Sequence, residues 1–155
     1  MKGNVALTQP EEIASRHECQ ERDNSFLAAL HLCSLYHHLV DAGRWTEFAR
    51  VFSADAEFTS LTGAVNRGAT AIAENLKRLS SRTDGLRAVA HHSTNVVVVE
   101  SDDHSAQVES KYFAIMSDGT VVSGLYIDRI VNTDVGWRIA SRHPQRLVGP
   151  SKKNY

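Results

Sequence analysis

The sequence predicts a single α+β domain, in which helices come first and long antiparallel strands follow. Two observations carry this prediction. Apolar residues recur at helical spacing in the first half, most regularly from Phe26 to Ala42. β-branched and alternating segments separated by tight polar turns fill the region from Leu86 to His143. The 155 residues suit one domain, 1–155, and no internal repeat or linker divides the chain.

Two helical segments are expected at the start of the chain. Pro10 and the two acidic residues after it favour a helix start, and a weak helix runs from there to about Arg22. The polar residues 23–25 offer an N-cap for the stronger helix that follows, and Gly43 ends that helix as a left-handed cap. Residues 1–9 and 148–155 are expected to be flexible, which leaves a core of about 24–147.

Shorter elements fill the middle of the chain. Trp45–Phe52 is expected to form a short helix, Glu57–Thr59 a short strand and Ala69–Leu79 a third helix, with a loop between Gly63 and Gly68. The remaining segments predict an antiparallel meander, because tight turns join long neighbouring strands. The expected strands are Leu86–Glu100, Ala106–Met116, Val121–Val131 and Trp137–His143.

Composition excludes several classes of partner. The net charge is -1, from 17 basic and 18 acidic residues, and no basic stripe suggests nucleic-acid binding. No apolar run reaches the roughly 20 residues of a membrane span, and no signal pattern opens the chain, so we expect a cytoplasmic protein. The 2 cysteines lack metal-ligand spacing and are expected to be buried free thiols. We expect no metal and no cofactor.

Several short phrases carry a family resemblance. Tyr36 is followed five residues later by Asp41, an F-x-x-D-A phrase begins at Phe52, an H-x-x-T-N phrase begins at His91, and a closing hairpin contains Trp137. Their order resembles the SnoaL-like (nuclear transport factor 2-like) superfamily over about residues 24–145. The resemblance implies a cone-shaped α+β barrel, with N-terminal helices packed on a curved, mixed but mostly antiparallel sheet around an apolar pocket.

The resemblance also implies a catalytic pair. Asp41 and His91 fall where scytalone dehydratase and the lindane dehydrochlorinase carry an Asp–His pair, whose histidine removes a proton as water or chloride leaves. A carboxylate on one ring nitrogen fixes the tautomer and stabilises the imidazolium, so the two side chains should lie within hydrogen-bond reach. Only one of His91 and His92 can point inward on a strand, and the family spacing favours His91. Otherwise, Asp41 is a solvated carboxylate at a helix end and His91 a strand histidine bonded to backbone.

Further side chains are expected to line the pocket. His37 lies one helical turn before Asp41 and shares its face, although packing or a surface role is an equal alternative. A strand tyrosine could polarise a carbonyl or serve only as a core aromatic. Arg142 and His143 end the last strand near the expected pocket mouth and are candidates. The expected substrate-binding residues are Tyr36, Tyr126, Tyr112, His37, Thr59 and Trp45.

The chain also departs from the two enzymes. Val40 stands where scytalone dehydratase has a substrate-polarising tyrosine, Gly124 and Tyr126 replace a serine and an asparagine, and Thr59 stands near its second catalytic tyrosine. The dehydrochlorinase's catalytic arginine has no clear match in residues 129–134. These differences indicate a substrate other than scytalone or lindane.

Three functions remain open from the sequence. The first is a cofactor-free dehydratase-type lyase that acts on a small, mostly apolar cyclic compound, such as a polyketide-like or aromatic one. The second is an isomerase or cyclase that uses the same base. The third is a non-catalytic ligand-binding or protein-association module, since fold alone does not fix function. We expect a homo-oligomer, dimer or trimer, because another copy usually covers the exposed sheet face in this fold.

Overall fold

The computed structural model describes residues 10–81 and 85–147, apart from the side chains of residues 10–19, 21 and 22. The helices and strands alternate at the start of the chain and four long strands follow, as an α+β chain would have them. The elements are α1 (Pro10–Asp41), the 3₁₀ helix η1 (Trp45–Arg50), β1 (Phe52–Thr59), β2 (Val65–Arg67), α2 (Ala69–Ser80), β3 (Ala88–Ser101), β4 (Ser105–Met116), β5 (Val121–Thr133) and β6 (Gly136–Arg146).

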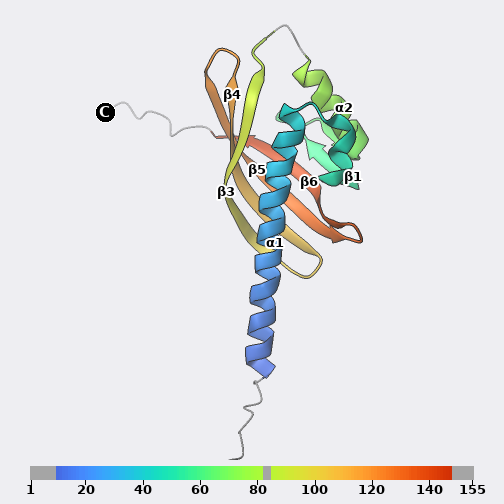
Figure 1. Cartoon of the computed structure of the whole chain (residues 1–155), viewed down its shortest axis with the longest axis vertical. Helices are drawn as coiled ribbons and strands as arrows, with labels where there is room; N and C mark the ends of the chain where they lie inside the picture. Colours follow the sequence, from blue (N-terminus) through green and yellow to red (C-terminus); the bar gives the residue numbers. More distant parts are fainter. Residues whose placement is uncertain (1–9, 82–84, 148–155) are drawn as a thin grey trace, which may run out of the picture.

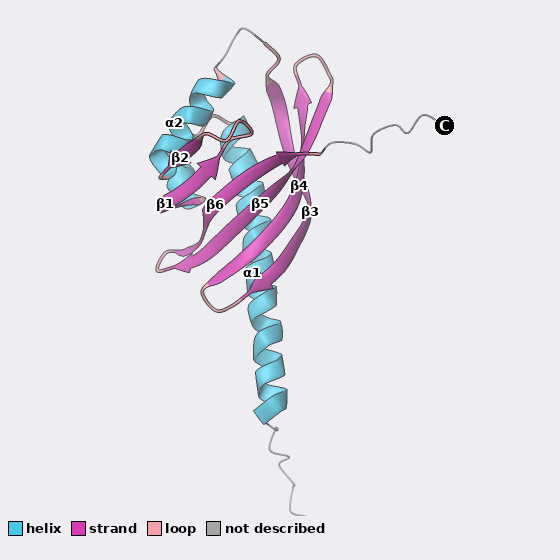
Figure 2. Cartoon of the chain, turned by 180° about the vertical axis from the view of Figure 1, so that it is seen from behind, coloured by secondary structure: helices cyan, strands magenta, loops and turns pink. Residues whose placement is uncertain are grey.

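All strands join one sheet of six strands in the order β2-β1-β6-β5-β4-β3. β1 and β6 pair in parallel, and every other pair is antiparallel. Figure 1 shows α1 crossing one face of this curved sheet, with α2 next to β1, and Figure 2 shows the opposite face. The fold class is therefore confirmed as helices packed on a mixed, mostly antiparallel sheet.

The core lies between α1 and the inner face of the sheet, and aromatic rings make up much of it. Tyr36 of α1 packs edge-on against Phe52 of β1 and Tyr126 of β5, at centroid distances of 5.9 and 6.1 Å. Such edge-to-face pairs add about 0.5–1.5 kcal/mol each beyond their buried area. One face of a single helix is thereby joined to two strands of the sheet.

A bulge bends the edge strand β3 around the helix. The register between β3 and β4 shifts between Thr94 and Val97, and Asn95 has a positive φ of 50°. An extra residue in one strand of a pair locally increases bend and twist, and asparagine tolerates the left-handed region better than most residues. The bend helps to close the sheet into the cone that the family resemblance implies.

Three local predictions were wrong. α1 is one continuous helix from Pro10 to Asp41, without the expected break at residues 23–25, because polar residues cost only about 0.7 kcal/mol or less each in a helix. The helix expected over Trp45–Phe52 is a 3₁₀ helix that ends at Arg50, since Phe52 already begins β1 and pairs with Ile139. The loop between Gly63 and Gly68 contains the short strand β2, which pairs with β1.

Some predictions lie beyond this description. The expected flexible ends, residues 1–9 and 148–155, fall outside the described residues. Within the described part of the chain, no helix is long and apolar enough to cross a bilayer.

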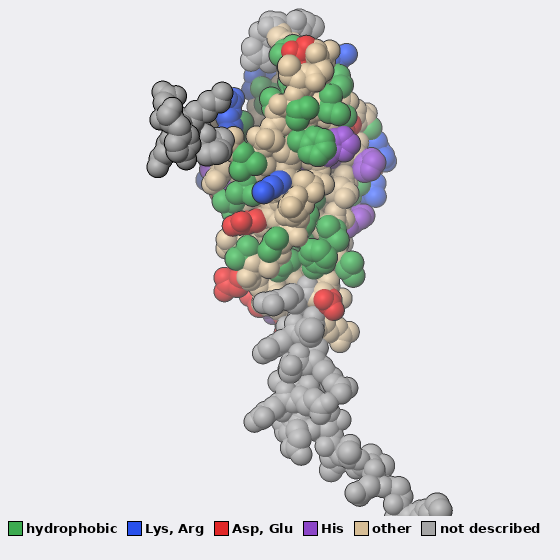
Figure 3. Space-filling view, turned by 90° about the vertical axis from the view of Figure 1, so that its left-hand side faces the viewer, with side chains coloured by type: hydrophobic (Ala, Val, Ile, Leu, Met, Phe, Trp, Pro, Cys, Tyr) green, Lys and Arg blue, Asp and Glu red, His purple; other side chains and the backbone are tan. Residues whose placement is uncertain are grey.

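Figure 3 shows hydrophobic side chains gathered in patches on the side where β3 lies, and Val97 and Val99 of that strand are exposed. The homo-oligomer stays a prediction.

Gly124 provides a test of how the strand tyrosines are packed. A Cβ atom at this position would come within 2.4 Å of both the Tyr112 ring and the carbonyl oxygen of Gln145. Because a backbone oxygen cannot move away cheaply, Gly124→Ala should lower the free energy of unfolding by about 1–3 kcal/mol. Urea denaturation would measure this loss, with Gly85→Ala as the control, since that Cβ would meet nothing within 4 Å. Equal stability of the two variants would contradict the packing.

Candidate functional site

The structure brings the carboxylate of Asp41 and the ring of His91 into direct contact. Asp41 Oδ1 lies 2.5 Å from His91 Nδ1, and the backbone N–H of His91 donates to Asp41 Oδ2 at 2.9 Å. The carboxylate therefore holds both the ring and the backbone of the same residue. With Nδ1 bound in this way, the Nε2 atom of His91 remains available for proton transfer.

The end of α1 sets the position of Asp41. Gly43 has a φ of 65°, and the N–H groups of Gly43 and Arg44 donate to the carbonyls of Val40 and Leu39 at 3.1 and 2.8 Å. These two bonds form a Schellman motif, which ends the helix at a fixed residue. As a result, Asp41 occupies the last position of α1, beside β3.

Strand alternation resolves the choice between the two neighbouring histidines of β3. The side chain of His91 is 22% exposed and faces α1, whereas His92 is exposed and stacks on Phe113 at 4.7 Å. Neighbouring residues of a strand point to opposite faces, so His92 lies on the outer side of the sheet. Only His91 can act together with Asp41.

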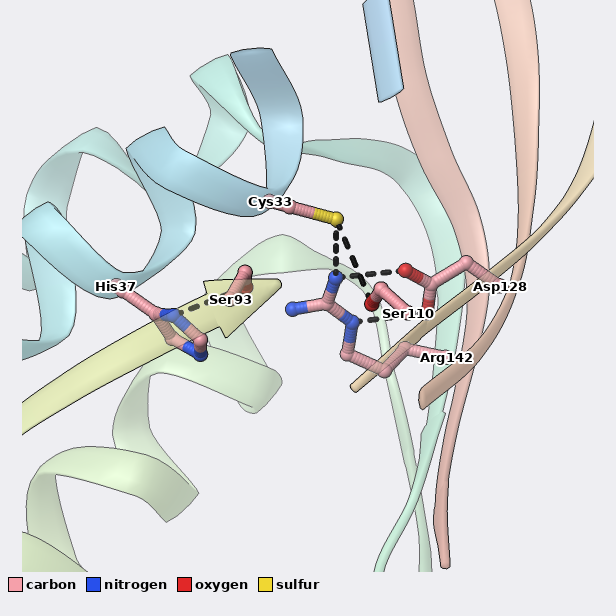
Figure 4. Close-up of polar contacts among 6 residues, drawn as sticks. All are labelled: Cys33, His37, Ser93, Ser110, Asp128 and Arg142. Atoms are coloured by element: carbon pink, nitrogen blue, oxygen red, sulfur yellow. Dashed lines mark hydrogen bonds and ion pairs between the residues drawn. The ribbon is translucent and has the colours of Figure 1, made fainter. Parts of the chain in front are cut away.

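A second histidine stacks behind His91. The ring of His37 lies 5.5 Å from that of His91 at an angle of 24°, and its Nδ1 is 3.1 Å from Ser93 Oγ (Figure 4). Burial, with a smaller contribution from the charge of Arg142, lowers the pKa of His37 to about 2. His37 is therefore a neutral, buried imidazole next to the Asp41–His91 pair.

An open pocket of about 500 Å³ lies beside the pair. The end of α1, α2 and the start of β3 form its walls, in which apolar side chains alternate with the polar groups of Asp41, Ser80, Arg87 and His91. Small-molecule sites commonly combine apolar walls with a few placed polar groups. The lining residues are Val40, Asp41, Ala42, Gly43, Trp45, Leu76, Leu79, Ser80, Leu86, Arg87, Ala88, Val89 and His91.

The interior also contains a buried ion pair that was not predicted. Arg142 is 1% exposed, and its Nε and Nη2 donate to the two carboxylate oxygens of Asp128 at 2.9 and 2.6 Å (Figure 4). Burial alone would lower the pKa of Arg142, but the charge and hydrogen bonds of Asp128 outweigh it and raise the pKa. Arg142 therefore carries its charge deep in the fold, not at the pocket mouth, and His143 is exposed.

Two tyrosine rings cover this guanidinium. Its central carbon lies 4.3 Å from the ring centroid of Tyr36 and 4.2 Å from that of Tyr126. A desolvated cation–π contact is worth about 2 kcal/mol. Burial raises the pKa of both tyrosines, so both hydroxyls stay protonated. Tyr112 is half-buried and stacks on Tyr126 at 4.4 Å.

Of the other two residues expected in the pocket, one lines it and one does not. Trp45 lines the pocket and packs on Phe48 at 5.6 Å. Thr59 lies at the end of β1, in register with Val65 at the sheet edge, and is not among the residues that line this pocket. Across residues 10–81 and 85–147, no group of three or more His, Cys, Asp or Glu side chains is arranged to hold a metal ion.

The buried ion pair predicts a large difference between two carboxylate variants. Asp128→Asn leaves a buried arginine without its counter-ion and should lower the free energy of unfolding by about 3–5 kcal/mol. Glu57→Gln removes the partner of Arg67 from an exposed pair and should cost at most about 1 kcal/mol. Urea denaturation at neutral pH would compare the two. Similar losses would show that the interior does not depend on the charge of Asp128.

The low pKa of His37 predicts a pH dependence of stability. Because the folded pKa, about 2, lies below the unfolded value of about 6.5, the unfolded chain binds the extra proton between these limits. Stability should therefore fall as pH drops below about 6.5, by up to ~1.4 kcal/mol per pH unit from this group. Urea denaturation from pH 7 to pH 5 should show a shallower fall for His37→Gln. His38→Gln removes an exposed imidazole from the same helix as a control. Identical slopes for His37→Gln and wild type would refute the assignment.

Comparisons with solved structures show the same fold. A candidate scytalone dehydratase from Novosphingobium aromaticivorans is 20% identical, with a TM-score of 0.67 over 83% of this chain and 89% of that one. A nuclear transport factor 2-like protein with a cystatin-like fold from the same species has a TM-score of 0.69 at 20% identity, over 94% and 95% of the chains. A Mycobacterium tuberculosis protein of unknown function is 28% identical, with a TM-score of 0.65 over 82% and 80%.

The comparison with protein families gives the assignment. Among curated proteins, none matches this chain. The SnoaL-like domain matches residues 25–143, which contain Asp41, His91 and all the strands down to the middle of β6. The chain therefore belongs to the SnoaL-like domain family.

Proposed function

We propose that this protein is a cofactor-free lyase of the dehydratase type, which acts on a small, mostly apolar cyclic compound. The observation that carries the proposal is the 2.5 Å contact between Asp41 Oδ1 and His91 Nδ1 at the wall of an open pocket. A histidine oriented by a carboxylate is suited to remove a proton from carbon. The candidate scytalone dehydratase, whose fold is similar to that of this chain, is consistent with a dehydratase reaction.

Asp41 and His91 have separate tasks in this reaction. His91 Nε2 takes the proton from a carbon next to a carbonyl, while the leaving group departs from the adjacent carbon. Asp41 accepts the hydrogen bond of Nδ1, which fixes the ring and stabilises its protonated form. His91 then returns the proton to the leaving hydroxide, so that water is released and the histidine is ready again.

The pocket limits the substrate by size and polarity. Trp45, Leu76 and Leu79 offer apolar contacts, and a volume of about 500 Å³ suits a compound of one or two rings. Tyr36 and Tyr126, which the sequence predicted as substrate-binding residues, are not among the residues that line this pocket and pack against Arg142 instead. A cyclic β-hydroxy or β-halo carbonyl compound satisfies both the pocket and the base.

The reaction can be tested with matched histidine variants. Wild type, His91→Gln and His92→Gln would each meet a panel of cyclic β-hydroxy and β-halo carbonyl compounds, with product masses recorded. Wild type and His92→Gln should release water or hydrogen halide, because His92 lies on the outer face of the sheet. His91→Gln should lower kcat by about 10²- to 10⁴-fold, the usual contribution of a general base. Asp41→Asn should lower kcat with its fold intact.

Other outcomes would redirect the proposal. Turnover of the panel that is unchanged in His91→Gln would remove this base from the mechanism. A changed retention time without a change of mass would favour the isomerase or cyclase. Thermal stabilisation by a compound without any turnover would favour a ligand-binding module.

A further inference from the structure

Arg87 differs from most of the described arginines because its charge has no partner. Its backbone carbonyl accepts the N–H of Ser117 at 2.8 Å, but its side chain forms no hydrogen bond or ion pair within residues 10–81 and 85–147. Six other arginines donate to a carboxylate, amide or backbone oxygen, namely Arg44, Arg50, Arg67, Arg78, Arg138 and Arg142. An unpaired arginine on an open surface needs no explanation, so the position of Arg87 decides whether it has a role.

That position is in the wall of the pocket that contains the Asp41–His91 pair. Arg87 directly precedes β3, and the end of α1, α2 and the start of β3 lie at the same end of the molecule (Figure 1). Among the described residues that line the pocket, Arg87 is the only arginine or lysine, and it is exposed. A ligand in the pocket can therefore reach the guanidinium without breaking an existing contact.

The pocket carries two opposite charges at different places. The carboxylate of Asp41 lies beside the base, because it pairs with His91. Arg87 lies four residues before His91 in the chain, so their α carbons are at most about 14 Å apart. This separation leaves room for a ring between the two groups. An anionic group of a ligand is repelled by Asp41 and attracted by Arg87.

Apolar side chains supply the rest of the wall. They come from α1, α2 and the start of β3, and they are Val40, Leu76, Leu79, Leu86 and Val89. Such surfaces suit the carbon skeleton of a ring, whereas the few polar groups of a pocket fix its orientation. The arrangement therefore matches a ring compound with one acidic group.

We propose that Arg87 binds a carboxylate of the substrate and thereby orients the ring so that a C–H bond faces His91 Nε2. A carboxylate matches the planar guanidinium, which can donate two parallel hydrogen bonds to it. One guanidinium balances one negative charge, so a carboxylate fits better near Asp41 than a phosphate with nearly two. This inference rests on the proposed lyase function and narrows its substrates to ring compounds that carry a carboxylate away from the reacting carbon.

The binding of two similar ligands tests this role without turnover. The probes are 2-naphthoate and 2-naphthamide, which have the same two rings and nearly the same shape but differ in charge. Calorimetry at low salt should show tighter binding of 2-naphthoate by wild type. Arg87→Gln should lose about fivefold to tenfold of this preference, the scale of one charge-assisted pair at a partly exposed site. Arg87→Lys should keep part of it, since lysine has the charge without the planar fork.

A matched variant and a kinetic measurement provide the controls. Arg78→Gln removes an exposed arginine of α2 that does not line the pocket, and it should keep the full preference. In turnover, Arg87→Gln should raise KM for a cyclic β-hydroxy ketone that carries a carboxylate. The KM for the methyl ester of the same compound should stay unchanged, because the ester has no charge for Arg87 to bind.

The outcomes distinguish this role from the proposed reaction. If wild type binds the two probes equally, or Arg78→Gln loses as much preference as Arg87→Gln, the carboxylate site is wrong even if the enzyme turns over the panel. If Arg87→Lys binds 2-naphthoate no better than Arg87→Gln does, the positive charge is not what the ligand meets, and the site is equally wrong. If the preference follows Arg87 but no compound loses water or halide, the carboxylate site stands and the elimination is wrong.

Discussion

The buried ion pair between Arg142 and Asp128 is the interaction on which the interior of this protein depends. The two residues are direct neighbours on β6 and β5, and their charges lie where water cannot screen them. The guanidinium of Arg142 then packs against the rings of Tyr36 of α1 and Tyr126 of β5. The buried charge therefore contributes, together with the apolar core residues of α1, to the position of the helix on the sheet. Tyr36 and Asp41 belong to the same helix, so the contact of Tyr36 with the guanidinium lies five residues before the carboxylate that meets His91.

Much of the fold follows from local patterns in the sequence. A long periodic segment largely determines its own secondary structure. The α+β class was therefore predicted correctly, and α2 and the strands of the meander lie within a few residues of their predicted bounds. Part of what escaped prediction depends on contacts between distant residues. The parallel pairing of β1 with β6 joins residues more than 80 positions apart, and no local spacing reports it. The helix continues through residues 23–25 because a cap signal is only a weak preference.

In the candidate site, too, some residues could be predicted from local patterns and others could not. Asp41 and His91 could be found because spacing and a family resemblance place them together, and strand alternation then excludes His92. The burial of Arg142 was not predicted, since an arginine near the end of a strand is usually solvated. A signal did exist on β5, where Asp128 shares the inward face with Tyr126 and Ile130. A carboxylate between two core residues needs a cation, and the strand paired with it supplies one.

The pairing of β1 with β6 has a consequence for how the molecule assembles. β1 gains its inner neighbour only when the final strand has been added, and Arg142 belongs to that strand. Contacts of large sequence separation are slow to form, because the loop between them must close first. We therefore expect the cone and its interior charge to form together, late in folding. A partly folded chain would contain the helix and the meander, but neither a closed barrel nor the contact between the Arg142 guanidinium and Tyr36 of α1.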